Sequence, residues 1–192
     1  MRNTLTRAAA VAALTLSLGL TAACGRSEPA VDASGAPAPT NSTLAASLGD
    51  NDALGALAGV VEGAGLKTVL EGVGPYTVFA PTDAAFTAAG GAPGADEKAQ
   101  GATLVRAHIV PGAVTRADIN AALDRAGTGT VKMRTMNDGV LTFSREGQTI
   151  RVTADDGATA ALTGSETAAS NGVIQPVDGV LVKARDEGEE RQ

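Results

Sequence analysis

One histidine and one cysteine occur among the 192 residues, so the side chains that most often carry nucleophilic or metal chemistry are scarce. A serine or cysteine nucleophile needs an adjacent base, and His108 is the sole conventional base in the chain. Neither the Gly-x-Ser-x-Gly elbow nor the His-Glu-x-x-His or Cys-x-x-Cys spacing occurs. The sequence therefore predicts a protein that is not an enzyme, with no catalytic residue, no metal and no cofactor.

Asp83 and His108 are the two candidate binding residues. Asp83 follows a proline-threonine pair and can either cap a helix or contact a partner. His108 stands at the predicted end of a helix beside apolar residues, where it can pack and bond to the backbone or contact a ligand. The tripeptide 155–157, Asp-Asp-Gly, could contact calcium, but it is more typical of a hairpin turn.

The first 23 residues are typical of a cleaved export signal. Arg2 and Arg7 form a positive start, and residues 8–20 are an apolar run of 13 residues without an acidic side chain. This run is shorter than the ~20 helical residues that span a bilayer core. Small residues follow it, which completes the order found in signal peptides.

Cys24 is the only cysteine, so no disulfide can form within the chain. The run Leu20-Thr-Ala-Ala-Cys24 resembles a bacterial lipobox, which implies that Cys24 carries lipid and becomes the first residue of the mature protein. Thr21 stands where leucine is commoner, and the alternative is an ordinary signal peptide cut near Ala23 that leaves a free thiol. Acyl chains such as palmitate would anchor the protein, since each buried methylene contributes ~0.8 kcal/mol. We expect an exported lipoprotein of the bacterial cell envelope, on the periplasmic or extracellular face of a membrane.

Composition divides the rest of the chain into three parts. Residues 24–42 comprise Cys24 and a predicted flexible linker rich in Pro, Ala, Ser and Gly, with a mean reach on the order of 25 Å. Residues 43–184 have the composition and length of one globular domain, and residues 185–192 form a charged tail. Removal of residues 1–23 takes away two arginines and no acid, which lowers the formal net charge from −6 to −8. An acidic chain without basic runs argues against nucleic acid as a partner.

Helical spacing of apolar residues predicts five helices within the domain. The first has Asp52 as its cap and carries Leu54, Leu57 and Val61 on one face. The others cover residues 66–70, a short run through Phe86 capped by Thr82 or Asp83, residues 96–108, and residues 116–125 capped by Thr115. Residues 109–112, Ile-Val-Pro-Gly, are predicted to end the fourth helix in an extended turn.

Alternating apolar residues predict a strand at residues 76–79 and later strands at 141–143, 150–152, 158–162 and 173–182. Turn signals at 137–139, 146–147 and 155–157 separate the later strands. Helices come first and a β-meander later, so we predict an α+β domain.

Two segments resemble the signatures of the fasciclin-like domain, an extracellular interaction module. They are residues 77–86, TVFAPTDAAF, and residues 171–181, NGVIQPVDGVL. Residues 107–112, AHIVPG, resemble the central histidine segment and the Val-Pro-Gly turn of the same family. The resemblance covers nearly all of the domain and implies a fasciclin-like fold, in which a β-sandwich or wedge-like β core is flanked by several helices.

Several positions depart from the family pattern. Ala107 stands where a tyrosine usually precedes the central histidine, and Gln175 stands where the last signature often has a histidine. Pro176 cannot donate a ladder hydrogen bond and therefore favours an edge strand or a bulge. Glu166 and Thr167 stand where some animal relatives carry an Asp-Ile pair for integrin adhesion, so integrin-type recognition is not expected.

The resemblance implies a surface-tethered, extracytoplasmic binding or adhesion module without catalytic activity. The expected partners are an extracellular or envelope protein or a polysaccharide, and a membrane through the lipid on Cys24. The alternative is a carrier of a small apolar ligand such as a lipid or pigment. A carrier needs a cavity lined by side chains such as Leu66, Val69 and Leu104. The aromatic fraction of 2% leaves few surfaces for stacking a large pigment.

Overall fold

The computed structural model describes residues 38–183. The predicted signal peptide, Cys24, the linker up to residue 37 and the charged tail lie outside the described residues. The helices are α1 (Leu44–Gly49), α2 (Gly55–Gly63), α3 (Lys67–Glu71), α4 (Asp83–Ala88), α5 (Lys98–Ala107) and α6 (Arg116–Arg125). The strands are β1 (Tyr76–Pro81), β2 (Ile109–Pro111), β3 (Thr130–Arg134), β4 (Val140–Glu146), β5 (Thr149–Ala154), β6 (Thr159–Ala161), β7 (Thr167–Ala169) and β8 (Gly172–Val177).

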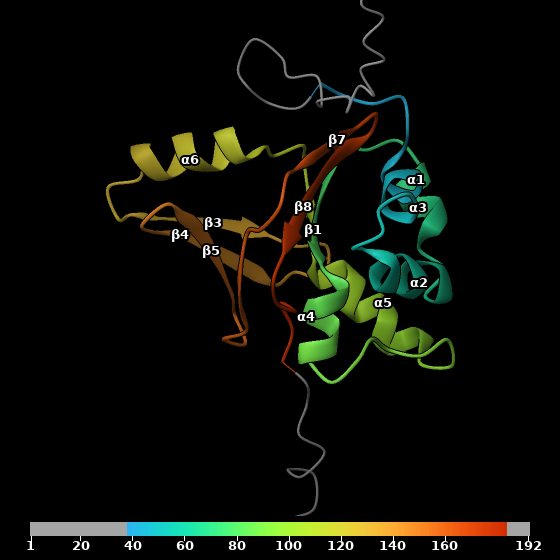
Figure 1. The fold of residues 1–192 in the computed structure, drawn as a ribbon. Helices are drawn as coiled ribbons and strands as arrows, with labels where there is room; N and C mark the ends of the chain where they lie inside the picture. Colours follow the sequence, from blue (N-terminus) through green and yellow to red (C-terminus); the bar gives the residue numbers. More distant parts are fainter. Residues whose placement is uncertain (1–37, 184–192) are drawn as a thin grey trace, which may run out of the picture.

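Two four-stranded sheets form the centre of the domain. The central sheet has the strand order β2-β1-β8-β7, and its β1 and β8 strands run parallel. The second sheet, β3-β4-β5-β6, is an antiparallel meander of consecutive strands. In Figure 1 the helices α1, α2, α3 and α5 lie to the right of the central sheet, and the meander and α6 lie to its left. The predicted α+β class, with helices first and a meander later, is confirmed.

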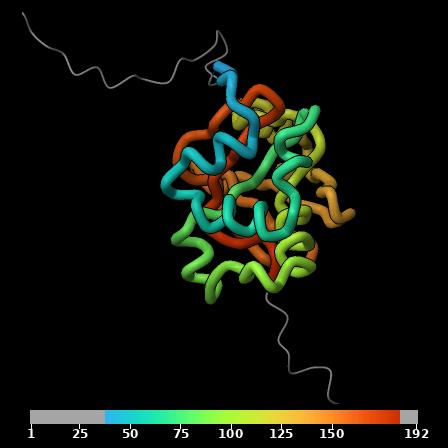
Figure 2. The backbone as a smooth tube through the Cα atoms, turned by 90° about the vertical axis from the view of Figure 1, so that its right-hand side faces the viewer, coloured from blue at the N-terminus to red at the C-terminus, as the bar shows by residue number. Residues whose placement is uncertain are grey.

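Strand β1 contributes side chains to both hydrophobic cores of the domain. Because side chains alternate along a strand, Val78 and Ala80 join the core beneath the helical layer, whereas Phe79 joins the core between the two sheets. The ring of Phe79 lies 5.1 Å, centroid to centroid, from that of Phe143 on the meander. Figure 2 views the helical layer face on, with α1, α2 and α3 spread over the central sheet. The sheet is therefore covered on both faces.

Two predicted helix caps are present. The Thr115 hydroxyl accepts a hydrogen bond from the Asp118 backbone N–H, and the Asp118 carboxylate accepts one from the Thr115 backbone N–H, which is a capping box at the start of α6. The hydrogen bonds from Thr115 lower the pKa of Asp118. Thr82 caps α4 by accepting the N–H of Ala85 at 3.2 Å.

The predicted Asp52 cap is wrong. Helix α2 begins at Gly55, and its N-cap residue Leu54 makes no side-chain capping bond. The Asp83 carboxylate instead accepts the Ala56 N–H at 2.8 Å. A residue 27 positions away along the chain thus satisfies a donor at the start of α2, which local sequence reasoning could not show.

Residues 109–111 form a strand rather than only a turn. Ile109 pairs with Val78 and Pro111 pairs with Tyr76, so β2 lies antiparallel to β1 at one edge of the central sheet. The sequence also does not predict α1, β3 or β7, which are six, five and three residues long. Such short elements carry too little periodicity to be recognised, and packing against the rest of the domain stabilises them.

The last residues of the predicted linker belong to the folded domain. The Thr40 N–H donates to the Ala168 carbonyl and the Ser170 N–H donates to the Ser42 carbonyl, both at 2.9 Å. These bonds hold residues 40–42 alongside β7. The backbone of this edge strand would otherwise lack partners there, so the domain boundary lies earlier than residue 43.

The sequence favours an edge strand or a bulge for Pro176, whereas the structure places it in β8, which lies between β1 and β7. Pro176 pairs with Ala80 of β1, and its carbonyl accepts the Thr163 N–H at 2.8 Å. The N and C=O of a strand residue point to the same side, and on that side β7 has already ended at this level. The missing N–H of proline is therefore tolerated in a central strand.

Candidate functional site

The two signature segments meet as neighbouring strands in the middle of the molecule. Strands β1 and β8 pair in parallel from Tyr76 opposite Gly172 to Pro81 opposite Val177. Most of the paired side chains are buried, including Thr77, Phe79 and Gln175 at 0% exposure. These segments therefore build the centre of the fold rather than an exposed surface.

Asn171, at the start of the second signature, joins three elements. Its Oδ1 accepts the Leu44 N–H at 2.8 Å, and its Nδ2 donates to the carbonyls of Leu70 at 2.9 Å and Gly72 at 2.7 Å. The first bond satisfies an N–H at the start of α1, and the other two satisfy carbonyls at the end of α3. One amide side chain thus fastens two helices to the central sheet.

Glycine is required at position 172 because the backbone of β1 approaches it closely. A Cβ atom at this position would overlap the Tyr76 carbonyl oxygen and would stand 2.8 Å from Cδ1 of Leu44. Gly74 has a similar constraint, since a Cβ there would overlap the Asn171 carbonyl. The Asn-Gly pair of the signature is thus explained by packing and hydrogen bonding within the domain.

Asp83, a predicted binding residue, lies at the first position of α4, and its carboxylate faces the start of α2. The Asp83 N–H also donates to the Ala53 carbonyl at 2.9 Å. Asp83 is therefore a helix cap, but of α2 rather than of the helix on which it stands. Contact between Asp83 and a partner stays a prediction.

His108, the second predicted binding residue, is fully buried at the end of α5. Its Nε2 atom lies 2.9 Å from the Leu181 backbone N–H, so Nε2 must accept and Nδ1 must carry the proton. Nδ1 then donates to the Leu104 carbonyl at 2.8 Å. Burial lowers the pKa of His108 from 6.5 to about 4, partly opposed by the Leu104 carbonyl and by Asp156. The imidazole therefore joins α5 to the end of the second signature as a neutral group.

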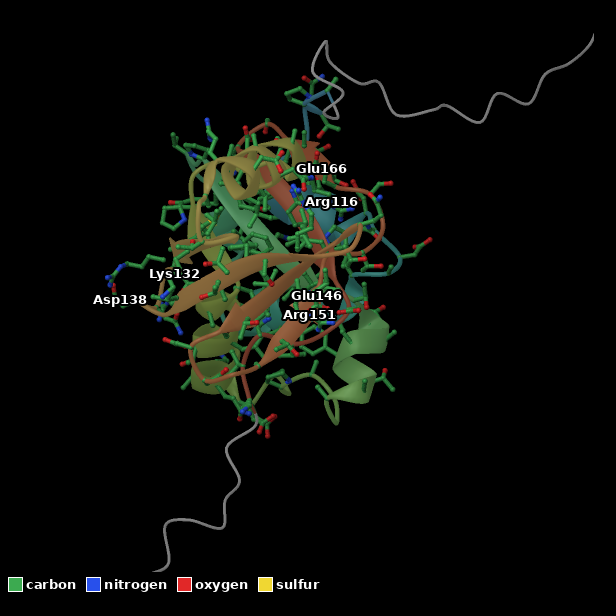
Figure 3. The ribbon with its side chains drawn as sticks, turned by 90° about the vertical axis from the view of Figure 1, so that its left-hand side faces the viewer. Arg116, Lys132, Asp138, Glu146, Arg151 and Glu166 are labelled. Carbon is green, nitrogen blue, oxygen red and sulfur yellow. The ribbon has the colours of Figure 1, made fainter. Side chains whose placement is uncertain are left out.

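Arg116 is the centre of a polar network that the sequence does not predict. Its Nε donates to the Gln175 side-chain carbonyl at 3.1 Å, and its Nη atoms donate to the carbonyls of Gly164 at 2.7 Å and Thr163 at 2.6 Å. The Glu166 carboxylate accepts the Arg116 backbone N–H at 2.8 Å and a bond from Gln175 Nε2. Figure 3 shows Arg116 and Glu166 side by side above the meander.

This network gives a structural role to two of the departures from the family pattern. Gln175 is buried and also donates to the Val114 carbonyl at 3.2 Å, so all the hydrogen bonds recorded for its amide are internal. Glu166 holds the start of α6. Burial lowers the pKa of the Arg116 guanidinium and Glu166 opposes that effect. The departures at Gln175 and Glu166 were the signals in the sequence that pointed to this region.

Asp155 and Asp156 form the turn between β5 and β6, as the sequence predicts. The Asp156 carboxylate accepts the N–H groups of Ala158 and Lys183, each at 2.8 Å. Across residues 38–183, no three His, Cys, Asp or Glu side chains gather in a way that could hold a metal ion. The bonds of Asp156 are those of a turn residue.

Two small hollows lie on the described part of the chain. One, of about 80 Å³, lies between α5 and the β3–β4 and β5–β6 turns, and the other, of about 100 Å³, lies among α1, α2 and α3. Neither is lined by Leu66, Val69 or Leu104, the side chains proposed for an apolar cavity. Drug-sized ligands occupy pockets of roughly 300–1,000 Å³. In the span 38–183, no helix has both the length and the apolar character needed to cross a membrane.

Comparison with known proteins agrees with this architecture. Residues 52–183 match the family model of the fasciclin domain. The chain is 28% identical over 137 residues to protein sll1483 of Synechocystis sp., covering 69% of this chain and 68% of that protein. It also resembles a solved FAS1 domain pair from the insect cell adhesion molecule fasciclin I, with a TM-score of 0.64 and 15% identity.

The structural match covers 76% of this chain and 52% of the insect domain pair, so the chain spans about half the length of that domain pair. At 15% identity this likeness shows the fold, and it confirms the predicted fasciclin-like arrangement of helices around a β core. The family match covers more than half of the chain and includes both signature segments. The chain therefore belongs to the fasciclin domain family.

Proposed function

We propose that this protein is a non-catalytic binding domain that is tethered to the outer face of a bacterial membrane. The observation that carries the proposal is its membership of the fasciclin family, whose domains are associated with adhesion and binding. The structural relative is an insect cell adhesion molecule, which is in line with this role.

The internal bonding of the signature residues supports binding through the surface. Asn171, Gly172 and His108 are occupied in holding helices and strands together. His108, the sole conventional base, is buried and makes two hydrogen bonds to backbone groups. A partner would therefore contact outward-facing side chains of the sheets and helices.

Tethering is proposed from the first 24 residues. Their charged start, short apolar run and lipobox-like end favour export and lipid attachment at Cys24. In Figures 1 and 2 the described chain begins at the end of the molecule near β7 and finishes at the opposite end. An anchor that precedes Ala38 would leave the helical layer and the meander accessible to a partner. Display of many copies on one membrane would let individually weak contacts act together.

Crosslinking on intact producing cells tests this function, with mass spectrometry of whatever is captured with the chain. Repeated capture of one envelope or extracellular protein, or of a polysaccharide fragment, would support the proposal. Capture of bulk lipid alone would contradict it and favour the carrier of an apolar ligand.

The anchor has a separate test that does not depend on the partner. The proposal expects wild-type protein in the membrane fraction and the variant Cys24→Ser in the soluble extracytoplasmic fraction. Both proteins should unfold at the same temperature, because residue 24 lies outside the predicted domain. Retention of Cys24→Ser in the membrane fraction would show that another feature holds the protein there.

A further inference from the structure

The outward face of the meander is rich in hydroxyl groups. The inward side chains of β4 and β5, such as Leu141, Phe143 and Val152, fill the core between the sheets. The residues between them must therefore point outward. The outward side chains include Thr130, Thr142, Ser144, Thr149, Thr153 and Thr159, all partly or fully exposed. We name this set the hydroxyl face.

Strand register places these hydroxyls in rows. Thr130, Ser144 and Arg151 stand opposite one another on β3, β4 and β5, and Lys132, Thr142 and Thr153 form the next row. Neighbouring strands in a sheet are ~4.8 Å apart, so each row is a line of closely spaced polar groups. Helix α6 does not cover the rows, because its Ile119 and Leu123 pack into the core on the other side of the meander.

Three cations frame the hydroxyl face. Lys132 is exposed and makes no hydrogen bond or ion pair within residues 38–183. Arg134 meets Asp138 at 3.3 Å, but both side chains are largely exposed, so this pair is weak. The Arg151 Nε forms an ion pair with Glu146 at 2.7 Å but is buried without a hydrogen bond of good geometry, and among residues 38–183 no hydrogen bond of its Nη groups occurs. Figure 3 labels Lys132, Glu146 and Arg151 over the meander strands.

Charge is distributed unevenly between the two sides of the molecule. Residues 44–107, which form the helical layer, β1 and α4, carry seven acidic and three basic side chains. Residues 116–161, which form α6 and the meander β3 to β6, carry six basic and six acidic side chains. The Asp156 carboxylate at the end of the meander is occupied by backbone N–H groups. A polyanion would therefore meet less repulsion at the meander than at the helical side.

The hydroxyl face lacks the side chains on which other kinds of partner depend. Protein interfaces centre on aromatic and large apolar anchors, and neutral sugars commonly need an aromatic surface against which to pack. Phe79, Phe86 and Phe143 are buried, and Tyr76, the fourth aromatic residue, is partly buried against the core beneath the helical layer. Affinity at the hydroxyl face must come from hydrogen bonds and charge.

From this combination we propose that the hydroxyl face binds a strand of carboxylated polysaccharide. The sugar hydroxyls and ring oxygens would exchange hydrogen bonds with the threonine rows. The carboxylates would contact Lys132 and the Nη groups of Arg151, whose Nε is paired with Glu146. Lys132 and Arg151 lie in adjacent rows on either side of β4. This inference rests on the proposed binding function and specifies the class of partner.

Binding of the full mature chain to immobilised polygalacturonate, with dextran as the neutral polymer, tests this inference. The chain should bind polygalacturonate and not dextran, and binding should weaken as salt rises. The variant Lys132→Ala/Arg151→Ala should weaken binding by about tenfold or more. The control variant Lys67→Ala/Lys98→Ala removes the same charge from the helical side and should change binding less than about twofold.

Lys132→Glu provides a second variant, because this exposed side chain can be changed without disturbing the fold, and it should weaken polygalacturonate binding as well. Three results would overturn the inference. They are an equal loss of polygalacturonate binding in Lys67→Ala/Lys98→Ala and in Lys132→Ala/Arg151→Ala, equal binding of the chain to dextran and polygalacturonate, and no binding to polygalacturonate at low salt. If the polymer fails to bind while intact-cell crosslinking still captures a protein, the hydroxyl face is wrong and the binding function stands. If polygalacturonate does not bind and intact-cell crosslinking captures no partner, the proposed binding function is wrong as well.

Discussion

The imidazole of His108 connects two distant parts of the chain, since its Nε2 accepts the Leu181 backbone N–H at 2.9 Å and its Nδ1 donates to the Leu104 carbonyl at 2.8 Å. Both bonds need the neutral ring with its proton on Nδ1. Protonation of Nε2 would place two donors against each other in a buried site. The single histidine of the chain therefore makes its folded state sensitive to acid.

The pKa of His108 is about 4 in the folded protein and 6.5 ordinarily. Between these values the unfolded chain binds more protons, so the free energy of unfolding falls as pH is lowered from 6.5 towards 4. The pKa difference corresponds to a loss of about 3 kcal/mol. Denaturant unfolding at a series of pH values should show this decline.

The variant His108→Gln is the control for this pH dependence. It should be less stable than wild type at pH 7 because it cannot make both bonds. Its stability should then depend less on pH between 6.5 and 4, because no imidazole titrates there. An identical pH slope in the two proteins would show that His108 is not the responsible group.

Asp83→Ala should destabilise the domain by about 1 kcal/mol, because the Ala56 N–H at the start of α2 loses its acceptor. Asp83→Asn, which keeps an acceptor oxygen, should lose less. Asp52→Ala should leave the melting temperature unchanged, since no side chain of residue 52 caps α2. Thermal unfolding compares the three variants. A larger loss of stability in Asp52→Ala than in Asp83→Ala would show that Asp52 caps α2, as the sequence predicts.

Gly172→Ala should destabilise the protein by about 3 kcal/mol or more, because the new Cβ would overlap the Tyr76 carbonyl and force β1 and β8 apart. Gly59→Ala is the matched control. Residue 59 lies inside α2 with no atom within 4 Å of an added Cβ, so alanine should stabilise it by roughly 0.5–1 kcal/mol. If Gly172→Ala and Gly59→Ala shift the melting temperature in the same direction from wild type, β1 and β8 do not approach each other as closely as described.

Arg116→Lys should cost about 2 kcal/mol, because an ammonium group cannot donate simultaneously to Gln175 and to the Thr163 and Gly164 carbonyls. Hydrogen exchange should also rise in residues 163–166. Arg125→Lys, at the exposed end of the same helix, should change neither quantity. Similar effects of both variants would mean that residue 116 acts through helix charge alone.

The sequence predicts the parts of the fold that depend on local patterns. Thr82 and Thr115 cap their helices as expected, and the turns at 137–139 and 155–157 separate strands of the meander. These features arise within a few residues, where spacing and turn chemistry are informative. The α+β class follows from their order.

Long-range pairings explain most of the failures. The cap of α2 comes from Asp83, and β2 is recognised as a strand only through its pairing with β1. Pro176 is tolerated in a central strand because β7 ends before it. The first two outcomes depend on residues that lie far apart in sequence, and the third depends on where a three-residue strand ends, so a single chain gives no sign of any of them.

The candidate site was predictable only in part for the same reason. Family resemblance located the signature segments, but their internal role rests on contacts such as those of Asn171 with Leu44 and Leu70. Arg116 stood on a helix that had been predicted correctly, yet its partners lie about 47 to 59 residues away.

The proposed role as a tethered binding domain is tested most directly with beads that carry the mature chain. Cys24 is the only thiol, so coupling through it reproduces the proposed anchor and leaves the domain free. Binding of these beads to producing cells should rise steeply with the density of the chain and should vanish when the coupled protein is unfolded. Binding no greater than that of blank beads at every density would contradict the proposed function.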